Sequence, residues 1–344
     1  MNPERAQPGS RTTESLSPGQ MAPTPTSALS LQPSAFQIAC PPKINFYLRI
    51  VRKRDDGYHE LETVFQSVDG GDTLIGHVAE EMTLTCTDPT IPVDDRNLIY
   101  RAWHELEYRY PAARNKAAAL HLVKRTPAGA GMGGGSVDAA AALVLLSHLW
   151  DLRPSQDELV ELGASVGSDV PFFFVGGTAT AGGRGEVLTP VATAPLWLVL
   201  LRPAVSVSTP WAFRRWRSEA CGGPDMDEFV RVLATGDPQR VADALRNDLE
   251  PGVIAEVPEI AAAREWLLAQ GVLGARMTGS GSVVFGIARD AAHAQEIAGR
   301  PGAPGTVWAA RCLNAQEAAL VVRPCGAASQ PDPSANGSAS LPGA

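Results

Sequence analysis

The spacing of apolar residues changes repeatedly along this chain, between the alternation typical of strands and the three-to-four spacing typical of helices. Strands are predicted at 36–51 with a kink at Pro41–Pro42, and at 62–68, 73–85, 118–125, 172–174, 177–187, 196–201, 275–278, 283–288 and 307–312. Helices are predicted at 97–110, 136–149, 229–233, 241–249, 260–268 and 291–298, and after Ser155, which with Glu158 forms a capping box. Mixed elements joined by short turns favour an α+β fold.

A chain of 344 residues is long enough for two domains. Residues 1–34 are rich in Pro, Ser and Thr and predict a disordered extension, and residues 326–344 predict a disordered tail. We expect an N-terminal domain at 35–190 and a C-terminal domain at 191–325.

The formal net charge of −8 argues against nonspecific binding of nucleic acid, which needs a basic surface. The five cysteines have no CxxC spacing, which indicates reduced thiols in a cytoplasmic protein without a zinc site. No apolar run resembles a signal peptide or reaches the length of a membrane span. We therefore expect a cytoplasmic monomer or homodimer that acts on a small molecule, without nucleic-acid or membrane partners.

The most informative segment is a glycine-rich loop that opens an alanine-rich helix. Glycine lacks a side chain, so successive backbone N–H groups can approach the oxygens of a phosphate, and the helix dipole adds about 0.3–1 kcal/mol. We expect this loop to hold a nucleoside triphosphate, ATP. Its candidate contact residues are Pro127, Ala128, Gly129, Ala130, Gly131, Met132, Gly133, Gly134, Gly135, Ser136 and Val137.

Other glycine-rich loops fit this segment less well. A Walker A loop would end in Gly-Lys-Ser/Thr, but Gly135 is followed by Ser136 and no lysine. A dinucleotide loop matches formally, yet Asp151 follows the helix directly and leaves no room for the second strand that should carry the acid. A glycine-rich turn without a ligand stays open as the plain structural alternative.

Three segments, 41–45, 127–136 and 277–282, together resemble the GHMP kinase superfamily, in the same order and over about the whole folded span. The resemblance implies a two-domain GHMP kinase fold, with an N-terminal domain like ribosomal protein S5 domain 2 and a ferredoxin-like C-terminal domain. It also implies an ATP-dependent small-molecule kinase with Mg²⁺.

Segments 43–48, 56–61, 64–66 and 168–173 are similar to one branch of this superfamily. Its members phosphorylate the 2-hydroxyl of a cytidine diphosphate-linked methylerythritol in the non-mevalonate isoprenoid pathway. Other GHMP kinases, a nucleotide-binding protein without activity and an RNA-binding module on the S5-like fold remain alternatives.

Two charged residues are the candidate catalytic groups. Asp169 precedes an apolar run, where a carboxylate is costly unless it is paired or functional, although it could simply cap a turn. Lys43 follows two prolines on an apolar strand, although a lysine on an edge strand can also be solvated. The resemblance pairs them: Asp169 would orient or accept the hydroxyl proton, and Lys43 would keep that carboxylate ionised.

The resemblance also assigns the remaining candidate site residues. Asn45 and His59 would bind the substrate, and Tyr58, Phe65 and Phe213 would flank its cytosine ring, with Trp211 as an alternative to Phe213. Turn, core and surface roles are the plain alternatives for Tyr58, His59 and Phe65. Asn97 would lie near the adenine of ATP, or act as a helix N-cap.

One position departs from the family pattern. The family loop usually has two serines after its glycines, whereas this chain has Ser136 followed by Val137. No magnesium ligand can be assigned on this basis. Asp138 is a candidate, although an acid in the first turn of a helix also favours the helix dipole.

Overall fold

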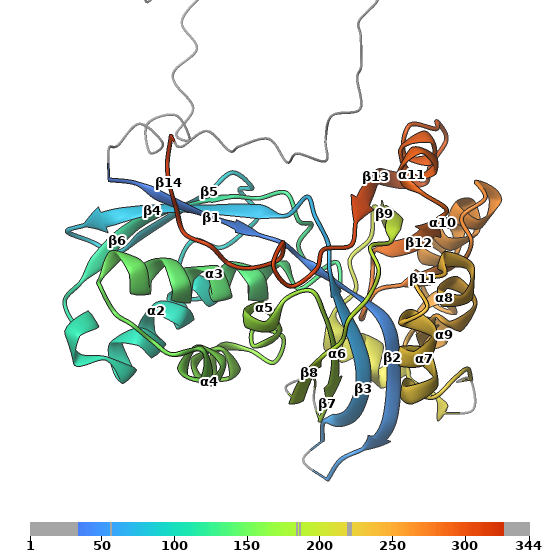
Figure 1. Cartoon of the computed structure of the whole chain (residues 1–344), viewed down its shortest axis with the longest axis horizontal. Helices are drawn as coiled ribbons and strands as arrows, with labels where there is room; N and C mark the ends of the chain where they lie inside the picture. The colour runs from blue at the N-terminus through green and yellow to red at the C-terminus, as the bar shows by residue number, and fades with distance from the viewer. Residues whose placement is uncertain (1–33, 56, 184, 186, 219–221, 327–344) are drawn as a thin grey trace, which may run out of the picture.

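The computed structural model describes residues 34–55, 57–183, 185, 187–218 and 222–326. Apart from residues 34 and 326, the tails predicted at 1–34 and 326–344 lie outside these ranges. The described residues form three sheets and the helices that cover them (Figure 1).

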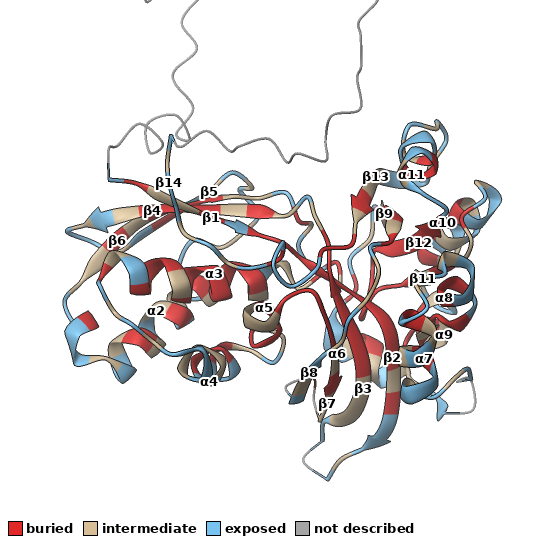
Figure 2. Cartoon of the chain, viewed as in Figure 1, coloured by how far each residue is buried: buried red, intermediate tan, exposed pale blue. Residues whose placement is uncertain are grey.

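The first sheet has the strand order β14-β1-β4-β6-β5, and helices cover one of its faces (Figure 1). Its strands are β1 (Phe36–Cys40), β4 (Asp72–Ala79), β5 (Thr83–Cys86), β6 (Ala117–Val123) and β14 (Arg323–Pro324). The helices are α2 (Leu98–Arg109), α3 (Gly134–Leu149) and α4 (Gln156–Val166), with the short 3-10 turn η1 (Pro111–Ala113) after α2. Helix α3 packs on β1 and β4 and also against α2 and α4, so it is buried on nearly every side (Figure 2). Its alanines allow this close packing because they are small.

The second sheet has the order β10-β2-β3-β7-β8 and joins the two halves of the chain. Its strands are β2 (Lys43–Lys53), β3 (His59–Ser67), β7 (Thr178–Gly182), β8 (Val187–Pro190) and β10 (Arg246–Asn247). Strand β10 pairs in parallel with β2, which lies two hundred positions earlier in the chain. The sheet therefore holds residues from both sides of the expected domain boundary.

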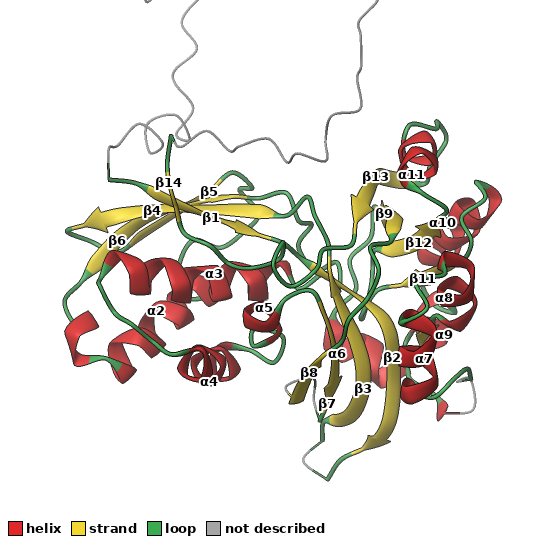
Figure 3. Cartoon of the chain, viewed as in Figure 1, coloured by secondary structure: helices red, strands yellow, loops and turns green. Residues whose placement is uncertain are grey.

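The third sheet has the order β11-β12-β9-β13, with helices against it (Figure 3). Its strands are β9 (Trp197–Pro203), β11 (Ala275–Met277), β12 (Val284–Ala288) and β13 (Gly305–Arg311). The helices of this half are α6 (Thr209–Arg215), α7 (Met226–Leu233), α8 (Pro238–Ala244), α9 (Glu250–Ile254), α10 (Pro258–Ala269) and α11 (Ala291–Ala298). Strand β12 is buried throughout, because helices and neighbouring strands enclose it.

The α+β class, the strand at 36–51 with its break at the two prolines, and the capping box of Ser155 are confirmed. Four predicted elements are wrong. The strand predicted at 177–187 is two strands, β7 and β8. The segment 73–85 is two strands, separated at the charged pair Glu80–Glu81. The apolar run at 172–174 is a short helix, α5 (Phe172–Val175), and the second half of the helix predicted at 241–249 is strand β10. The division at residues 190 and 191 stays a prediction, and β10 and β14 cross it.

A membrane-spanning helix is absent from the part of the chain that the structure describes.

Candidate active site

The glycine-rich loop connects β6 to α3. Gly129, Gly131 and Gly133 have φ angles of 61°, 75° and 67°, in the left-handed region that glycine adopts without strain. Left-handed residues at alternate positions turn successive backbone N–H groups toward one side, which makes a concave site for an anion. Helix α3 begins at the next residue, Gly134, and directs its positive end to the same place.

The loop is clamped between two other segments. A Cβ atom on Gly131 would lie 2.2 Å from the carbonyl oxygen of Thr278, in the second glycine turn. A Cβ atom on Gly133 would lie 3.2 Å from Cε of Lys43. These close approaches explain why the loop uses glycine at both positions, and they bring the three sequence motifs together.

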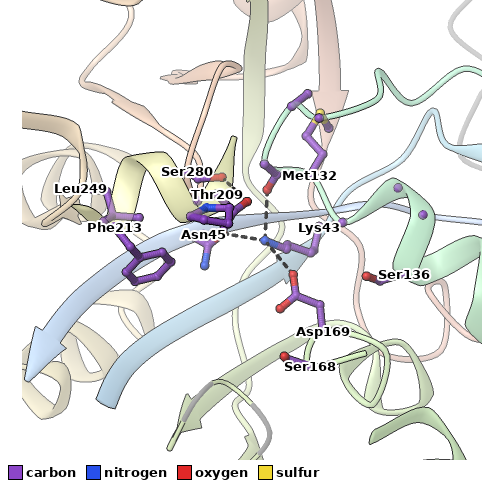
Figure 4. Close-up of a pocket in the computed structure, with 18 of the residues that line it drawn as sticks. Lys43, Asn45, Met132, Ser136, Ser168, Asp169, Thr209, Phe213, Leu249 and Ser280 are labelled. Atoms are coloured by element: carbon purple, nitrogen blue, oxygen red, sulfur yellow. Dashed lines mark hydrogen bonds and ion pairs between the residues drawn. The ribbon is translucent and has the colours of Figure 1, made fainter. Parts of the chain in front are cut away.

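Lys43 is the charged group at the centre of this arrangement (Figure 4). Its Nζ donates hydrogen bonds to Oδ1 of Asn45 at 2.8 Å and to the carbonyl oxygen of Gly131 at 3.0 Å. It also pairs with Oδ2 of Asp169 at 3.4 Å. The lysine side chain is 5% exposed and the aspartate side chain 34%, so the cation is fixed while the carboxylate remains accessible.

Asn45 is held by contacts from two other elements. Its backbone N–H donates to Oγ1 of Thr278 at 2.9 Å, and its Nδ2 donates to Oγ1 of Thr63 at 2.8 Å. Its Oδ1 is therefore directed at Lys43, and the strand register of β2 and β3 sets the position of the lysine. Asn45 is 3% exposed, so it contacts other residues of the chain rather than solvent.

Asp169 lies in a turn between α4 and α5. Helix α4 ends at Gly167, and the N–H of Val170 donates back to the carbonyl oxygen of Gly167. The buried side chains of Val170, Phe172 and Phe173 anchor the residues that follow. The apolar run therefore fixes the turn, and the carboxylate faces the cavity rather than the core.

A cluster of aromatic rings forms the end of the site that lies away from the glycine loop. His59, at the start of β3, stacks on Phe213 of α6 with ring centroids 5.0 Å apart and planes at 25°. Trp216 meets the same imidazole edge-on at 5.7 Å. Burial, followed by the nearby charge of Lys53, lowers the pKa of His59, so its ring is neutral at neutral pH.

The glycine loop, the Lys43–Asp169 pair and the ring cluster line one cavity of about 1030 Å³. The cavity brings together the predicted residues Lys43, Asn45, Tyr58, His59, Phe65, Asn97, Pro127, Ala128, Gly129, Ala130, Gly131, Met132, Gly133, Gly134, Gly135, Ser136, Asp169 and Phe213. It is large enough for two ligands, since pockets for one drug-sized molecule measure about 300–1,000 Å³. In Figure 4, Ser136 and Phe213 lie on opposite sides of Lys43.

Three predicted contacts need correction or refinement. Val137 is fully buried in the core under α3 and does not line the cavity, because its position on the helix turns it inward. Phe65 is 3% exposed and packs under Lys43 and against Phe172, so it is part of the cavity floor and the core. Asn97 is the N-cap of α2: its Oδ1 accepts from the N–H of Ile99, and its Nδ2 donates to the carbonyl oxygen of Pro92.

The structure places the two candidate rings Trp211 and Phe213 differently. Phe213 lines the cavity and stacks on His59, whereas Trp211 is outside the lining and lies under the guanidinium of Arg215 at 4.9 Å. Tyr58 is at the rim and is 58% exposed.

A second buried lysine in the cavity wall was missed from the sequence. Nζ of Lys124 lies 2.6 Å from Oδ2 of Asp72 and 2.7 Å from Oδ2 of Asp138. Burial raises the pKa of Asp138 to about 7, although the charge of Lys124 opposes this shift. Burial disfavours the charge of Lys124, yet the two carboxylates outweigh that effect and raise its pKa.

Thr209 and Ser280 also line the cavity, with their hydroxyl oxygens 2.9 Å apart. The turn Gly279–Ser280–Gly281 was a visible signal for Ser280, but Thr209 follows an apolar segment without any motif. Lys124 ends the strand before the glycine loop, and its acidic partner Asp72 is far away in sequence.

Comparison with known families identifies the class of protein. The family model described as the GHMP kinases N terminal domain matches residues 97–177, and the model described as GHMP kinases C terminal matches residues 228–305. Together with the three-sheet fold and the glycine loop, these matches define a GHMP kinase.

Proteins of similar sequence indicate which family within this class the chain resembles. The chain is 42% identical to the 4-diphosphocytidyl-2-C-methyl-D-erythritol kinase of Gloeobacter violaceus, over 76% of this chain and 89% of the relative. It is 39% identical to the protein of that name from Salinibacter ruber, over 74% of this chain and 90% of the relative.

Solved structures of kinases are also similar to this chain. A crystal structure of 4-(cytidine 5'-diphospho)-2C-methyl-D-erythritol kinase superposes with a TM-score of 0.70 at 35% identity, covering 80% of this chain and 98% of that one. A homoserine kinase from Cytophaga hutchinsonii, at 16% identity, shares the fold with a TM-score of 0.61. The chain belongs to the 4-diphosphocytidyl-2-C-methyl-D-erythritol kinase family.

Proposed function

We propose that this chain is an ATP-dependent kinase that phosphorylates the 2-hydroxyl of 4-diphosphocytidyl-2-C-methyl-D-erythritol, here called the cytidyl substrate. The reaction gives the 2-phosphate and belongs to the non-mevalonate route to isoprenoid precursors. Membership of the family supports this function. The single observation in the structure that carries it is the Lys43–Asp169 pair at 3.4 Å, beside a glycine loop and inside one cavity.

The chemistry follows from the two charges. The substrate's hydroxyl oxygen attacks the γ-phosphorus of ATP while its proton passes to the accessible carboxylate of Asp169, and the bond from the γ-phosphorus to the bridging oxygen breaks to release ADP. Lys43, fixed by Asn45 and the Gly131 carbonyl oxygen, pairs with the carboxylate of Asp169 and stabilises the charge on the transferring group. A positioned proton acceptor contributes about 10²–10⁴-fold to the rate.

The two ligands occupy opposite ends of the cavity in this proposal. The backbone N–H groups of the glycine loop and the start of α3 hold the triphosphate of ATP. Tyr58, His59 and Phe213 receive the cytosine end of the cytidyl substrate, at the opposite end of the cavity. The alcohol between these ends then lies near Asp169.

Mg²⁺ would accompany the nucleotide. This ion prefers oxygen donors, keeps several waters and is bound through one or two carboxylates together with substrate phosphates. Among the described residues there is no group of three or more His, Cys, Asp or Glu side chains that could hold a metal by themselves. Asp169 accepts the hydroxyl proton in this proposal. Asp138 also lines the cavity, and its Oδ1 has no hydrogen-bond partner among the described residues, so Asp138 would supply the carboxylate oxygen. Bound there, the ion would neutralise charge on the phosphates.

An ADP-release assay with several alcohols tests this function. The purified chain is supplied with MgATP and either the cytidyl substrate, homoserine or mevalonate, and ADP is measured with a coupled enzyme system. We expect turnover with the cytidyl substrate alone. Turnover with homoserine or mevalonate instead would assign the chain to another kinase activity, and ATP binding without turnover on any alcohol would overturn the enzyme assignment.

A further inference from the structure

The aromatic end of the cavity contains a ring that the sequence motifs do not include. Trp216 follows helix α6 directly, and its backbone N–H donates to the carbonyl oxygen of Phe213. Residues three apart at a helix end lie on the same side, so Phe213 and Trp216 both face His59. Both also line the cavity.

The three rings form a corner rather than a simple stack. Phe213 covers the imidazole of His59 face to face, with planes at 25°, and Trp216 meets its edge at 81°. Edge-to-face contacts between rings contribute about 0.5–1.5 kcal/mol beyond the area they bury. His59 is the first residue of β3, where it pairs with Lys53 of β2, and it follows the exposed Tyr58, so its ring lies at the end of the sheet.

The main chain around Trp216 is itself fixed. The guanidinium of Arg217 donates to the carbonyl oxygens of Trp216 and Arg214, which closes the end of α6. On the other side, the hydroxyl of Ser208 accepts from the N–H of Trp211 and caps the start of the helix. The ring of Trp216 is therefore presented by a short element held at both ends.

The buried indole nitrogens of Trp103, Trp150 and Trp216 all lack a hydrogen-bond partner among the residues that the structure describes. A buried N–H group without a partner costs about 1–3 kcal/mol, and buried tryptophans usually find one. Trp103 and Trp150 share this feature and lie outside the cavity lining, so the ring contact with His59 is what links Trp216 to the cavity.

We propose that Trp216 is a positioning residue that holds His59 against Phe213, so that the stacked pair forms one wall of a slot for the nucleobase of the substrate. The inference rests on the proposed function, because it assigns the pyrimidine ring of the cytidyl substrate to this end of the cavity. The ring edge of Trp216 prevents rotation of the imidazole, so that its neutral nitrogens meet the polar edge of the base.

The test compares three variants at matched concentrations of MgATP. Trp216→Ala should raise KM for the cytidyl substrate about tenfold, because stacking on an ordered ring is worth about 1–3 kcal/mol, while kcat and KM for ATP stay close to wild type. Trp216→Phe keeps a ring edge against His59 and should recover most of the loss. Trp211→Ala is the control, since Trp211 is on the same helix but outside the cavity lining, and it should leave KM unchanged.

A direct measurement of ligand binding distinguishes the possible results of this test. Cytidine diphosphate, titrated calorimetrically, should bind Trp216→Ala about tenfold more weakly than wild type, in line with the lost stacking. An unchanged KM in Trp216→Ala with an active wild type would overturn the inference alone. Equal losses in the Ala and Phe variants would also overturn it, because they would assign the effect to the indole N–H. A wild type that turns over a different alcohol and does not bind cytidine diphosphate would overturn the proposed function and the slot together.

Discussion

Two buried lysines line the same cavity, and their surroundings differ in one respect. Lys43 and Lys124 both have side chains 5% exposed, and both lie at the ends of strands next to the glycine loop. Lys124 is enclosed by Asp72 and Asp138, whose side chains are 0% and 3% exposed. Lys43 instead pairs with Asp169, a carboxylate that is 34% exposed and faces the cavity.

The difference separates a structural charge from a reactive one. The side chains of Asp72 and Asp138 are almost fully buried, and Asp72 also accepts hydrogen bonds from the backbone N–H groups of Arg125 and Thr126, which fixes the start of the loop. The partner of Lys43 can still meet an incoming hydroxyl. The burial of a lysine therefore says little about its role. The accessibility of the carboxylate that the lysine pairs with says much more.

Of the changes at the two lysines, removing the charge of Lys43 should have the larger effect on turnover. Lys43→Met should lower kcat by about 10²-fold or more, because it removes a cation that stabilises the transferring group. The fold should tolerate the change, since the Thr278 hydroxyl also contacts Oδ1 of Asn45 and the Gly131 carbonyl oxygen, and Asp169 stays partly in water. Steady-state kinetics and thermal unfolding of the same samples measure both quantities. A Lys43→Met variant with the wild-type kcat would contradict the difference in role between Lys43 and Lys124.

The same substitution at Lys124 should act on stability instead. Lys124→Met leaves two carboxylates buried without their cation, and breaking a buried ion pair in this way costs about 3–5 kcal/mol. Denaturant unfolding measures this loss against Lys43→Met as the matched control. If both variants lost the same stability, the two sites would not differ in the way described here.

A smaller effect is expected from Asp138→Asn, and it depends on pH. The pKa of Asp138 is about 7 in the folded chain, against 3.8 for an unperturbed aspartate. The folded chain therefore holds a proton that the unfolded chain has released between these values, and wild-type stability falls as pH rises through that range, by up to about 1.4 kcal/mol per pH unit.

Asparagine does not titrate, so the variant should gain stability relative to wild type as pH rises from 5 to 7, and the gain should level off above that range. Unfolding curves recorded at pH 5, 6, 7 and 8 measure the difference. Parallel pH dependences for the two proteins would show that Asp138 is ionised throughout.

Much of the site was predictable because its parts carry local signals. Glycines at alternate positions indicate a loop that needs left-handed residues, and Gly129, Gly131 and Gly133 have that conformation. Asp169 before an apolar run indicated a constrained carboxylate. The structure adds what depends on distance in the chain: Lys124 meets Asp72 across two neighbouring elements, and no local pattern links them.

The failures have the same origin. Phe172–Phe174 is too short for its period to be read, and the turn after Asp169 makes it a single helical turn. Residues 246–247 lie within the helix-like spacing of 241–249, but pairing with β2 extends them into a strand. Tertiary contacts override local preference at both places.

The accessible carboxylate beside Lys43 is the central claim, and Asp169→Asn tests it most directly. Single-turnover transfer from labelled ATP to the cytidyl substrate is measured together with the dissociation constant of ATP in the same preparation. The account predicts a loss of about 10²–10⁴-fold in the transfer rate, with the ATP dissociation constant nearly unchanged. A variant that keeps most of the wild-type transfer rate would contradict it.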